Sequence, residues 1–105
     1  MAPVGALTLS GWVEARTAGA PAALRNRILE HVRLLPADLP AAEALALAAR
    51  RSLDGVLAAA GNRGVALDLL AADGLITLAL LRQGEDDPAA LAAFARSLTE
   101  AAASA

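Results

Sequence analysis

The 105-residue sequence lacks cysteine and lysine, and its only tryptophan and phenylalanine are Trp12 and Phe94. Without cysteine the chain has no disulfide framework, no thiolate metal site and no thiol nucleophile. Without lysine it has neither the phosphate-binding lysine of a P-loop nor a lysine that forms a Schiff base. Nine arginines against eleven acidic residues leave a net charge of −2. This balance offers no basic surface for phosphates, so we do not expect a nucleic-acid partner.

Alanine and leucine dominate the residues that are present, at 30 and 20 positions. High hydrophobicity with a low net charge argues against a disordered chain. A chain of this length forms one domain, given the usual domain size of roughly 100–200 residues. We therefore predict a single helical domain over residues 1–105, with a core built mostly from leucine and alanine.

The distribution of charge predicts neither a targeting signal nor a membrane span. The first fifteen residues contain no arginine, so no basic region precedes an apolar stretch as it does in a secretory signal. The most apolar run, residues 65–81, is interrupted by Asp68 and Asp73, and two carboxylates make a membrane span costly. These features predict a cytoplasmic protein without a membrane partner.

Proline and glycine divide the sequence into five predicted helices, over residues 7–16, 21–35, 40–60, 63–83 and 87–102. Thr8 or Ser10 is a suitable N-cap for the first helix. Residues 7–10 also alternate like a short strand, but a lone strand would have no partner, so we favour the helix. Gly84 is expected to end the fourth helix, and Pro88 to open the fifth.

The spacing of apolar residues supports these helices. The stripe of the second helix is Leu24, Ile28, Val32 and Leu35, and that of the fifth is Leu91, Phe94, Ala95, Leu98 and Ala102. The fourth helix is apolar on nearly every side, which is typical of a helix enclosed by its neighbours. Gly61 and Asn62 indicate a tight turn before it. Because all connections are short, we predict an all-α, antiparallel up-down bundle of four to five helices with an apolar central fourth helix.

Asp68 and Asp73 lie on the otherwise apolar fourth helix, where a carboxylate is costly unless it is paired. Their five-residue spacing turns them about 140° apart, at roughly 100° per residue, so they cannot chelate one ion from a straight helix. We expect each aspartate to reach either an arginine of another element, as a buried ion pair, or a helix terminus of another element. The candidate partners are Arg50, Arg51 and Arg63.

Trp12 is interpreted either as a packing anchor or as an exposed contact for a partner, since tryptophan is enriched at binding hot spots. Leucines outside the main stripes predict a second apolar face, with Leu78, Leu80 and Leu81 as the candidate interface. This excess of leucine predicts a structural or interaction protein. It would act through self-association as a homo-oligomer, or as a subunit or adaptor that docks on a protein partner in a larger assembly.

The alternative hypothesis is a small-molecule- or metal-binding helical enzyme that uses Asp68 and Asp73 with nearby arginines. His31 is the only histidine, whereas zinc needs three or four ligands. None of the serines lies in a nucleophile motif. We therefore predict no catalytic residue, no metal site and no cofactor, and favour the interaction role.

Overall fold

The computed structural model describes residues 8–58 and 64–104, and the regular structure within these two ranges is entirely helical. In chain order the elements are α1 (Leu9–Arg16), α2 (Ala22–Arg33), α3 (Ala41–Ala58), α4 (Gly64–Asp86), the short 3-10 helix η2 (Pro88–Ala90) and α5 (Leu91–Ser104). The predicted all-α helical bundle is confirmed. The predicted turn at Gly61 and Asn62 lies outside the described residues.

Single residues set the starts of the first three helices. The Thr8 hydroxyl accepts a hydrogen bond from the backbone N–H of Gly11 at 2.9 Å, so Thr8 is the N-cap of α1 and the helix is preferred to a strand. Pro21 and Pro40 directly precede α2 and α3. A proline at a helix start leaves no intrahelical hydrogen bond unmade, because the first N–H groups of a helix have no partner within it.

α4 continues past Gly84 to Asp86, so the prediction that Gly84 ends this helix is wrong. Arg82 Nε donates to the two carboxylate oxygens of Asp86 at 3.0 and 2.9 Å, which ties together the turn that contains the glycine. The helix ends before Pro88 because proline disfavours helical backbone in the residue that precedes it. That residue, Asp87, has φ −155° and ψ 82° and is the N-cap of η2.

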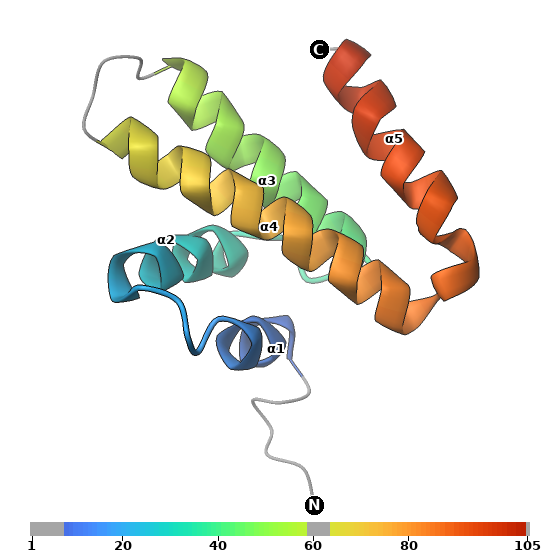
Figure 1. Ribbon diagram of the computed structural model, residues 1–105, viewed down its shortest axis with the longest axis horizontal. Helices are drawn as coiled ribbons and strands as arrows, with labels where there is room; N and C mark the ends of the chain where they lie inside the picture. The colour runs from blue at the N-terminus through green and yellow to red at the C-terminus, as the bar shows by residue number, and fades with distance from the viewer. Residues whose placement is uncertain (1–7, 59–63, 105) are drawn as a thin grey trace, which may run out of the picture.

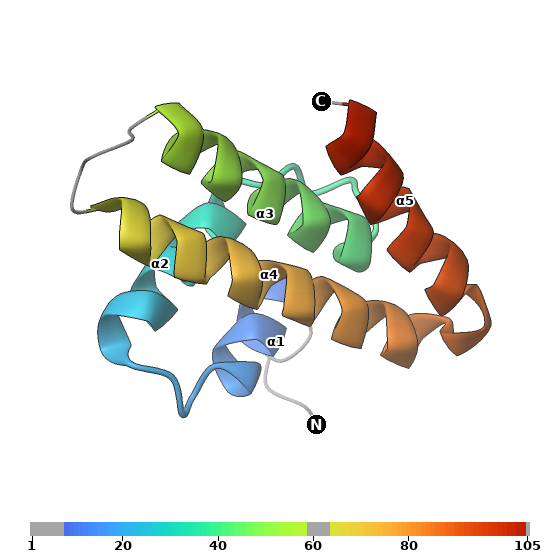
Figure 2. The ribbon, with the colours of Figure 1, turned by 45° about the horizontal axis from the view of Figure 1, so that its top comes forward.

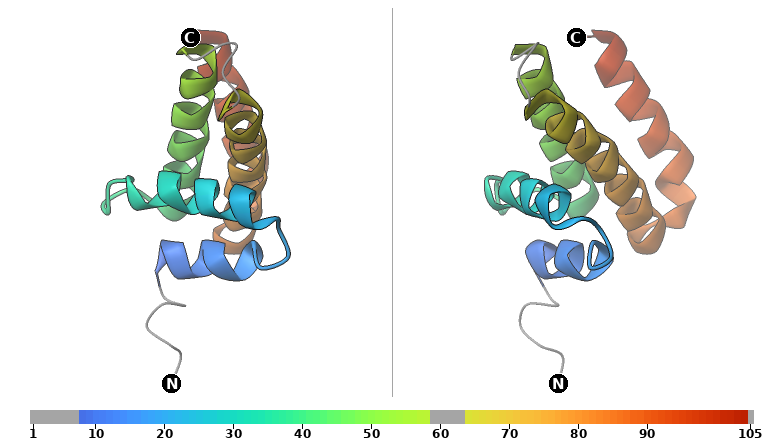
Figure 3. Two further views of the ribbon diagram at one scale, coloured as in Figure 1. Left: turned by 90° about the vertical axis from the view of Figure 1, so that its left-hand side faces the viewer. Right: turned by 60° about the vertical axis from the view of Figure 1, so that its left-hand side comes forward.

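The five α-helices form a hairpin, a pair of helices that crosses it, and a fifth helix that diverges from it. α3 and α4 lie side by side and antiparallel, with the most extensive contact between any two described helices (Figures 1 and 2). α1 and α2 run across this hairpin rather than along it (Figure 3). α5 turns back after η2 and diverges from the hairpin toward its C-terminal end (Figure 1). The bundle therefore has a packed side against α2 and an open side between the hairpin and α5.

The core lies where α1 and α2 meet the hairpin. Its buried members are Val13, Ile28, Leu29, Val32, Leu45, Ala48, Ala49, Ala71, Leu75, Leu78 and Ala79. Many of these are alanines of α3 and α4, whose small side chains let the two backbones approach closely. Across the same seam the buried Ser52 hydroxyl donates a 2.7 Å hydrogen bond to the carbonyl oxygen of Asp68. This bond links α3 to α4 at one point of their contact.

α4 is central but not enclosed. It contacts α2, α3, η2 and α5, yet Leu69, Leu70 and Leu81 remain between 42% and 56% exposed. The expectation that neighbours surround this helix is wrong, because α2 crosses it and α5 diverges from it. Among the described residues α4 is the one helix long and apolar enough to cross a membrane, with a mean hydropathy of 1.9. By length and composition alone this is a weak indication, since core helices of globular proteins pass the same test.

Candidate functional site

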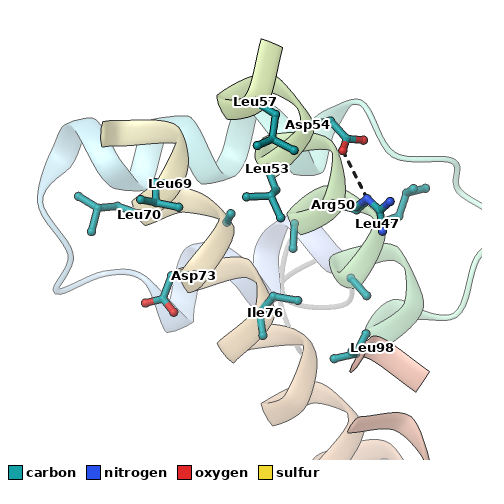
Figure 4. A pocket seen from close by; sticks show the side chains of 13 residues that line it. Leu47, Arg50, Leu53, Asp54, Leu57, Leu69, Leu70, Asp73, Ile76 and Leu98 are labelled. Atoms are coloured by element: carbon teal, nitrogen blue, oxygen red, sulfur yellow. Dashed lines mark hydrogen bonds and ion pairs between the residues drawn. The ribbon is translucent and has the colours of Figure 1, made fainter. Parts of the chain in front are cut away.

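An open apolar groove, here named the α3–α5 groove, lies between the α3–α4 hairpin and α5 (Figure 4). Its volume is about 1120 Å³. The large apolar side chains that line it are Leu47, Leu53 and Leu57 from α3, Leu69, Leu70 and Ile76 from α4, and Leu98 from α5. No residue of α1 or α2 lines it, so the groove belongs to the open side of the bundle.

Leucine side chains of the groove are left in contact with water. Leu57 is 72% exposed, and Leu53 next to it on α3 is 38% exposed. Both project from α3 into the hollow (Figure 4). On the α4 wall Leu69 and Leu70 are more than half exposed. A contiguous apolar patch of this kind marks an interaction site more often than scattered apolar residues do.

Charged side chains occur only at the edges of the groove lining. On the α3 edge Arg50 Nε lies 3.4 Å from Asp54 Oδ1, one helical turn away. On the α4 edge the Asp73 side chain is drawn outward from the helix (Figure 4). Within residues 8–58 and 64–104 its carboxylate makes no hydrogen bond or ion pair, and only its backbone carbonyl accepts a bond, from Thr77. The groove therefore combines an apolar floor with an unpaired carboxylate at one edge.

Asp73 was expected to form a buried ion pair, and the structure shows an exposed side chain instead. Of its expected partners, Arg50 pairs with Asp54, and Arg51 Nη1 donates to the backbone oxygen of Leu34 at 3.4 Å. Arg63 lies outside the described residues. The expectation for Asp73 is wrong because no helix covers this part of α4, so water solvates the carboxylate.

Asp68 does pair with an arginine of another helix, but with Arg27 of α2 rather than with Arg50 or Arg51. Asp68 Oδ1 lies 3.4 Å from Arg27 Nε and 3.8 Å from His31 Nε2. Arg27 and His31 are four residues apart and therefore share one face of α2. The Asp68 side chain is 22% exposed, so the pair is partly buried at the crossing of α2 and α4. The arginine was missed because sequence spacing does not reveal which helix crosses α4.

Asp68 and Asp73 are not brought together. Asp68 faces α2, whereas Asp73 lines the α3–α5 groove. No group of three or more potential metal ligands occurs in the part of the chain that the structure describes. These two carboxylates therefore do not form a joint binding or catalytic site.

Trp12 joins α1 to the C-terminal end of α4. Its indole N–H donates to Glu85 Oε1 at 3.2 Å, and Glu85 also pairs with Arg16 at 2.8 Å. The guanidinium carbons of Arg16 and Arg82 lie 5.4 and 5.3 Å from the centroid of the indole ring, within range of cation–π attraction. Trp12 is thus half-buried and makes its contacts within its own chain, which agrees with the interpretation of Trp12 as a packing anchor.

The three leucines predicted as an interface lie in different environments. Leu78 is buried in the core, so it is not accessible to a partner. Leu80 is half-buried, and Leu81 is exposed but does not line the α3–α5 groove. The exposed apolar face instead comprises residues around Leu57 and Leu69, neither of which belongs to the predicted interface. The sequence did contain a signal for this exposed face, because α4 is apolar on all sides. Once one side of such a helix packs against its neighbours, the apolar residues on its other side remain exposed.

Comparison of the chain with protein-family models, with curated proteins and with solved structures found no match. A function for this chain is therefore inferred from the groove and its residues alone.

Proposed function

We propose that this chain is a helical interaction protein that binds an amphipathic helix in the α3–α5 groove. The observation that carries the proposal is the cluster of exposed leucines around Leu57 and Leu69 in an open groove of about 1120 Å³. Recognition of a helix by an apolar groove uses anchor residues at positions i, i+3, i+4 and i+7. α3 and α4 lie side by side and line a groove along which such a helix can lie.

The free energy expected from burying the groove leucines supports a whole helix as the occupant of the groove, rather than a single contact residue. Full burial of a leucine contributes about 1.5–3 kcal/mol, so covering the exposed parts of four groove leucines contributes on the order of 3–6 kcal/mol. Association costs an estimated 4–15 kcal/mol in lost translational and rotational freedom. The occupant must therefore bury apolar area of its own, which a helix with an apolar stripe does.

The alternative function, an enzyme that uses Asp68 and Asp73, has less support. The two carboxylates lie on different sides of α4, and Asp68 is occupied by Arg27 and His31. The groove lining near Asp73 is otherwise apolar apart from Arg50 and Asp54. We therefore favour binding over catalysis.

The test is a titration of the full chain into a nanomolar, fluorescein-labelled synthetic amphipathic peptide with leucine and phenylalanine at positions i, i+3, i+4 and i+7. We expect binding with a rise in fluorescence anisotropy. Leu57→Glu should weaken it at least about tenfold, because a charge would then be buried against the peptide. Leu34→Glu is the matched control, since Leu34 is 74% exposed but lies outside the groove.

Equal loss of binding in the Leu57→Glu and Leu34→Glu variants would contradict the proposal, because it would show non-specific apolar contact. So would a wild-type chain that does not bind the peptide at all. Circular dichroism of both variants checks that helical content is retained.

A further inference from the structure

Asp73 interrupts the apolar stripe that forms the α4 wall of the α3–α5 groove. It follows Leu69 by four residues and precedes Ile76 by three, and residues at these spacings lie on one face of a helix. All three residues line the groove. A carboxylate therefore lies at a position where the pattern of this wall predicts another apolar side chain.

This carboxylate has no counter-charge in the part of the chain that the structure describes. Asp73 is exposed, and its side chain makes no hydrogen bond or ion pair there. The other two charged residues of the groove lining, Arg50 and Asp54, pair with each other on the opposite wall, where 3.4 Å separates their side chains (Figure 4). Asp73 therefore gives the groove lining one unbalanced negative charge.

Any occupant that covers the α4 wall removes water from Asp73. Burial of a carboxylate without a partner is costly, whereas a cation within about 4–6 Å favours its charged form. An occupant whose apolar face has no cation beside it would bury the groove leucines and this unpaired charge together. The leucines and the carboxylate are both satisfied only by an occupant that is apolar and carries a positive charge.

We propose that the helix bound in the α3–α5 groove belongs to a partner protein and carries an arginine or lysine beside its apolar stripe, at the position that faces Asp73. This inference depends on the proposed function and specifies the chemistry of the partner. The α3 residues that line the groove run from Ala46 to Leu57, which corresponds to about 16 Å, or three helical turns. A helix of that length presents its apolar anchors and the flanking cation together.

The need for a cation distinguishes this partner from two other apolar occupants. The acyl chains of a lipid bilayer carry no charge that could pair with Asp73. The apolar stripe of α5 in a second copy, which contains Phe94 and Leu98, has no cation beside it either. Arg96 is two residues from Leu98 and therefore lies on the opposite face of that helix. A partner helix with a basic flank is for this reason the favoured occupant.

Three synthetic peptides of identical composition test this placement of charge. All have leucine and phenylalanine anchors at i, i+3, i+4 and i+7, and each has two arginines. The arginines lie on one flank of the stripe (i+1 and i+8), on the other flank (i−1 and i+6) or on the opposite face (i+2 and i+9). Because the net charge of the peptides is equal, non-specific attraction to the acidic chain is the same for all three. We expect one flank peptide to bind the full chain about two- to fivefold more tightly than the opposite-face peptide, as an exposed ion pair would.

Variants of the full chain assign this preference to one carboxylate. Asp73→Asn should abolish the preference and leave the binding of the opposite-face peptide unchanged. Asp38→Asn is the matched control and should keep the preference, since it removes the same charge from an exposed residue outside the groove lining. Asp73→Arg should bind a peptide with glutamates in place of the flank arginines more tightly than the arginine peptide. Fluorescence anisotropy gives the dissociation constants, and circular dichroism checks that each variant is helical.

Several results would overturn the inference. Equal binding of all three peptides, lost in Leu57→Glu, would remove the role of the cation and leave the proposed function standing. A chain that binds none of the peptides would overturn both. A flank preference that persists in Asp73→Asn would assign the cation to another acidic residue. Binding to phosphatidylcholine–phosphatidylglycerol vesicles that requires Leu57, or self-association that requires it, would make lipid or a second copy the occupant instead.

Discussion

Leu75 and Leu70 lie five residues apart on α4, yet Leu75 is fully buried and Leu70 is 56% exposed. Leu75 belongs to the core where α1 and α2 meet the hairpin. Leu70 lines the open α3–α5 groove. Both residues are leucines of one regular helix, so residue type does not explain the difference. The number of helices packed against each side of α4 does.

The acidic residues of α4 repeat this contrast. Asp68, on the side of α2, has Arg27 and His31 as partners, whereas Asp73, on the groove side, has water. On α4 the packed side thus pairs a carboxylate with an arginine and fills its apolar space, although the nearby buried His31 Nε2 makes no hydrogen bond. The groove side of α4 leaves both its carboxylate and its leucines exposed. The groove side of α4 therefore presents exposed apolar surface, and the proposed binding role depends on that surface.

The largest expected effect separates the two leucines. Leu75→Ala should lower the free energy of unfolding by about 2–5 kcal/mol, because it leaves a cavity in the core. Leu70→Ala should change it by less than about 0.5 kcal/mol in the monomer. Urea denaturation followed by circular dichroism at two protein concentrations measures both. If Leu75→Ala and Leu70→Ala lowered the free energy of unfolding equally at low protein concentration, α4 would not have one packed and one open side. A loss of stability for Leu70→Ala that grows with protein concentration would show that a second copy covers the groove.

An intermediate effect is expected for the two aspartates. Asp68→Asn should lower the free energy of unfolding by about 1 kcal/mol, since it weakens a partly buried, charge-assisted contact to Arg27. Asp73→Asn should have no measurable effect on folding, because its carboxylate has no partner in the described part of the chain. Thermal unfolding of the two variants in parallel checks this. If Asp73→Asn were the more destabilising, the assignment of Asp73 to an open edge would be wrong.

The smallest expected effect concerns two helix-interior glycines. A Cβ on Gly55 would meet no atom within 4 Å, so Gly55→Ala should raise the free energy of unfolding by about 0.5–1 kcal/mol through helix propensity. A Cβ on Gly74 would lie 3.1 Å from Ile28 Cδ1 on the packed side. Gly74→Ala should therefore gain less than Gly55→Ala, or lose stability. Chemical denaturation of both variants measures the difference, and an equal gain would mean that α2 packs on α4 less tightly than described.

Much of the local structure could be predicted from the sequence. Thr8 as a cap, the prolines before α2 and α3, and the stripe that contains Ile28 and Val32 were all assigned from spacing and residue type. The predicted end of α4 was wrong because the prediction considered only the low helix propensity of Gly84. The ion pair between Arg82 and Asp86, four residues apart, spans that turn and offsets part of the cost of the glycine.

The candidate site could be predicted only in outline. An excess of leucine over what the bundle can enclose was visible, and it indicated a second apolar face. The leucines assigned to that face included Leu78, which is buried, and excluded Leu69 and Leu70, which line the groove. On a helix that is apolar all round, periodicity carries no information about which side meets a neighbour.

The sequence by itself determined that this chain is helical, where most of its helices begin, and that it has more leucine than its core uses. These properties depend on capping, proline and local spacing, which act within one or two helical turns. Only the tertiary structure decided that α2 crosses α4 at Asp68, that α5 diverges from the hairpin, and therefore which leucines face water. Crossing and divergence depend on contacts between residues far apart in the chain, such as Ser52 with Asp68 and Trp12 with Glu85. Those contacts are not encoded in any local pattern.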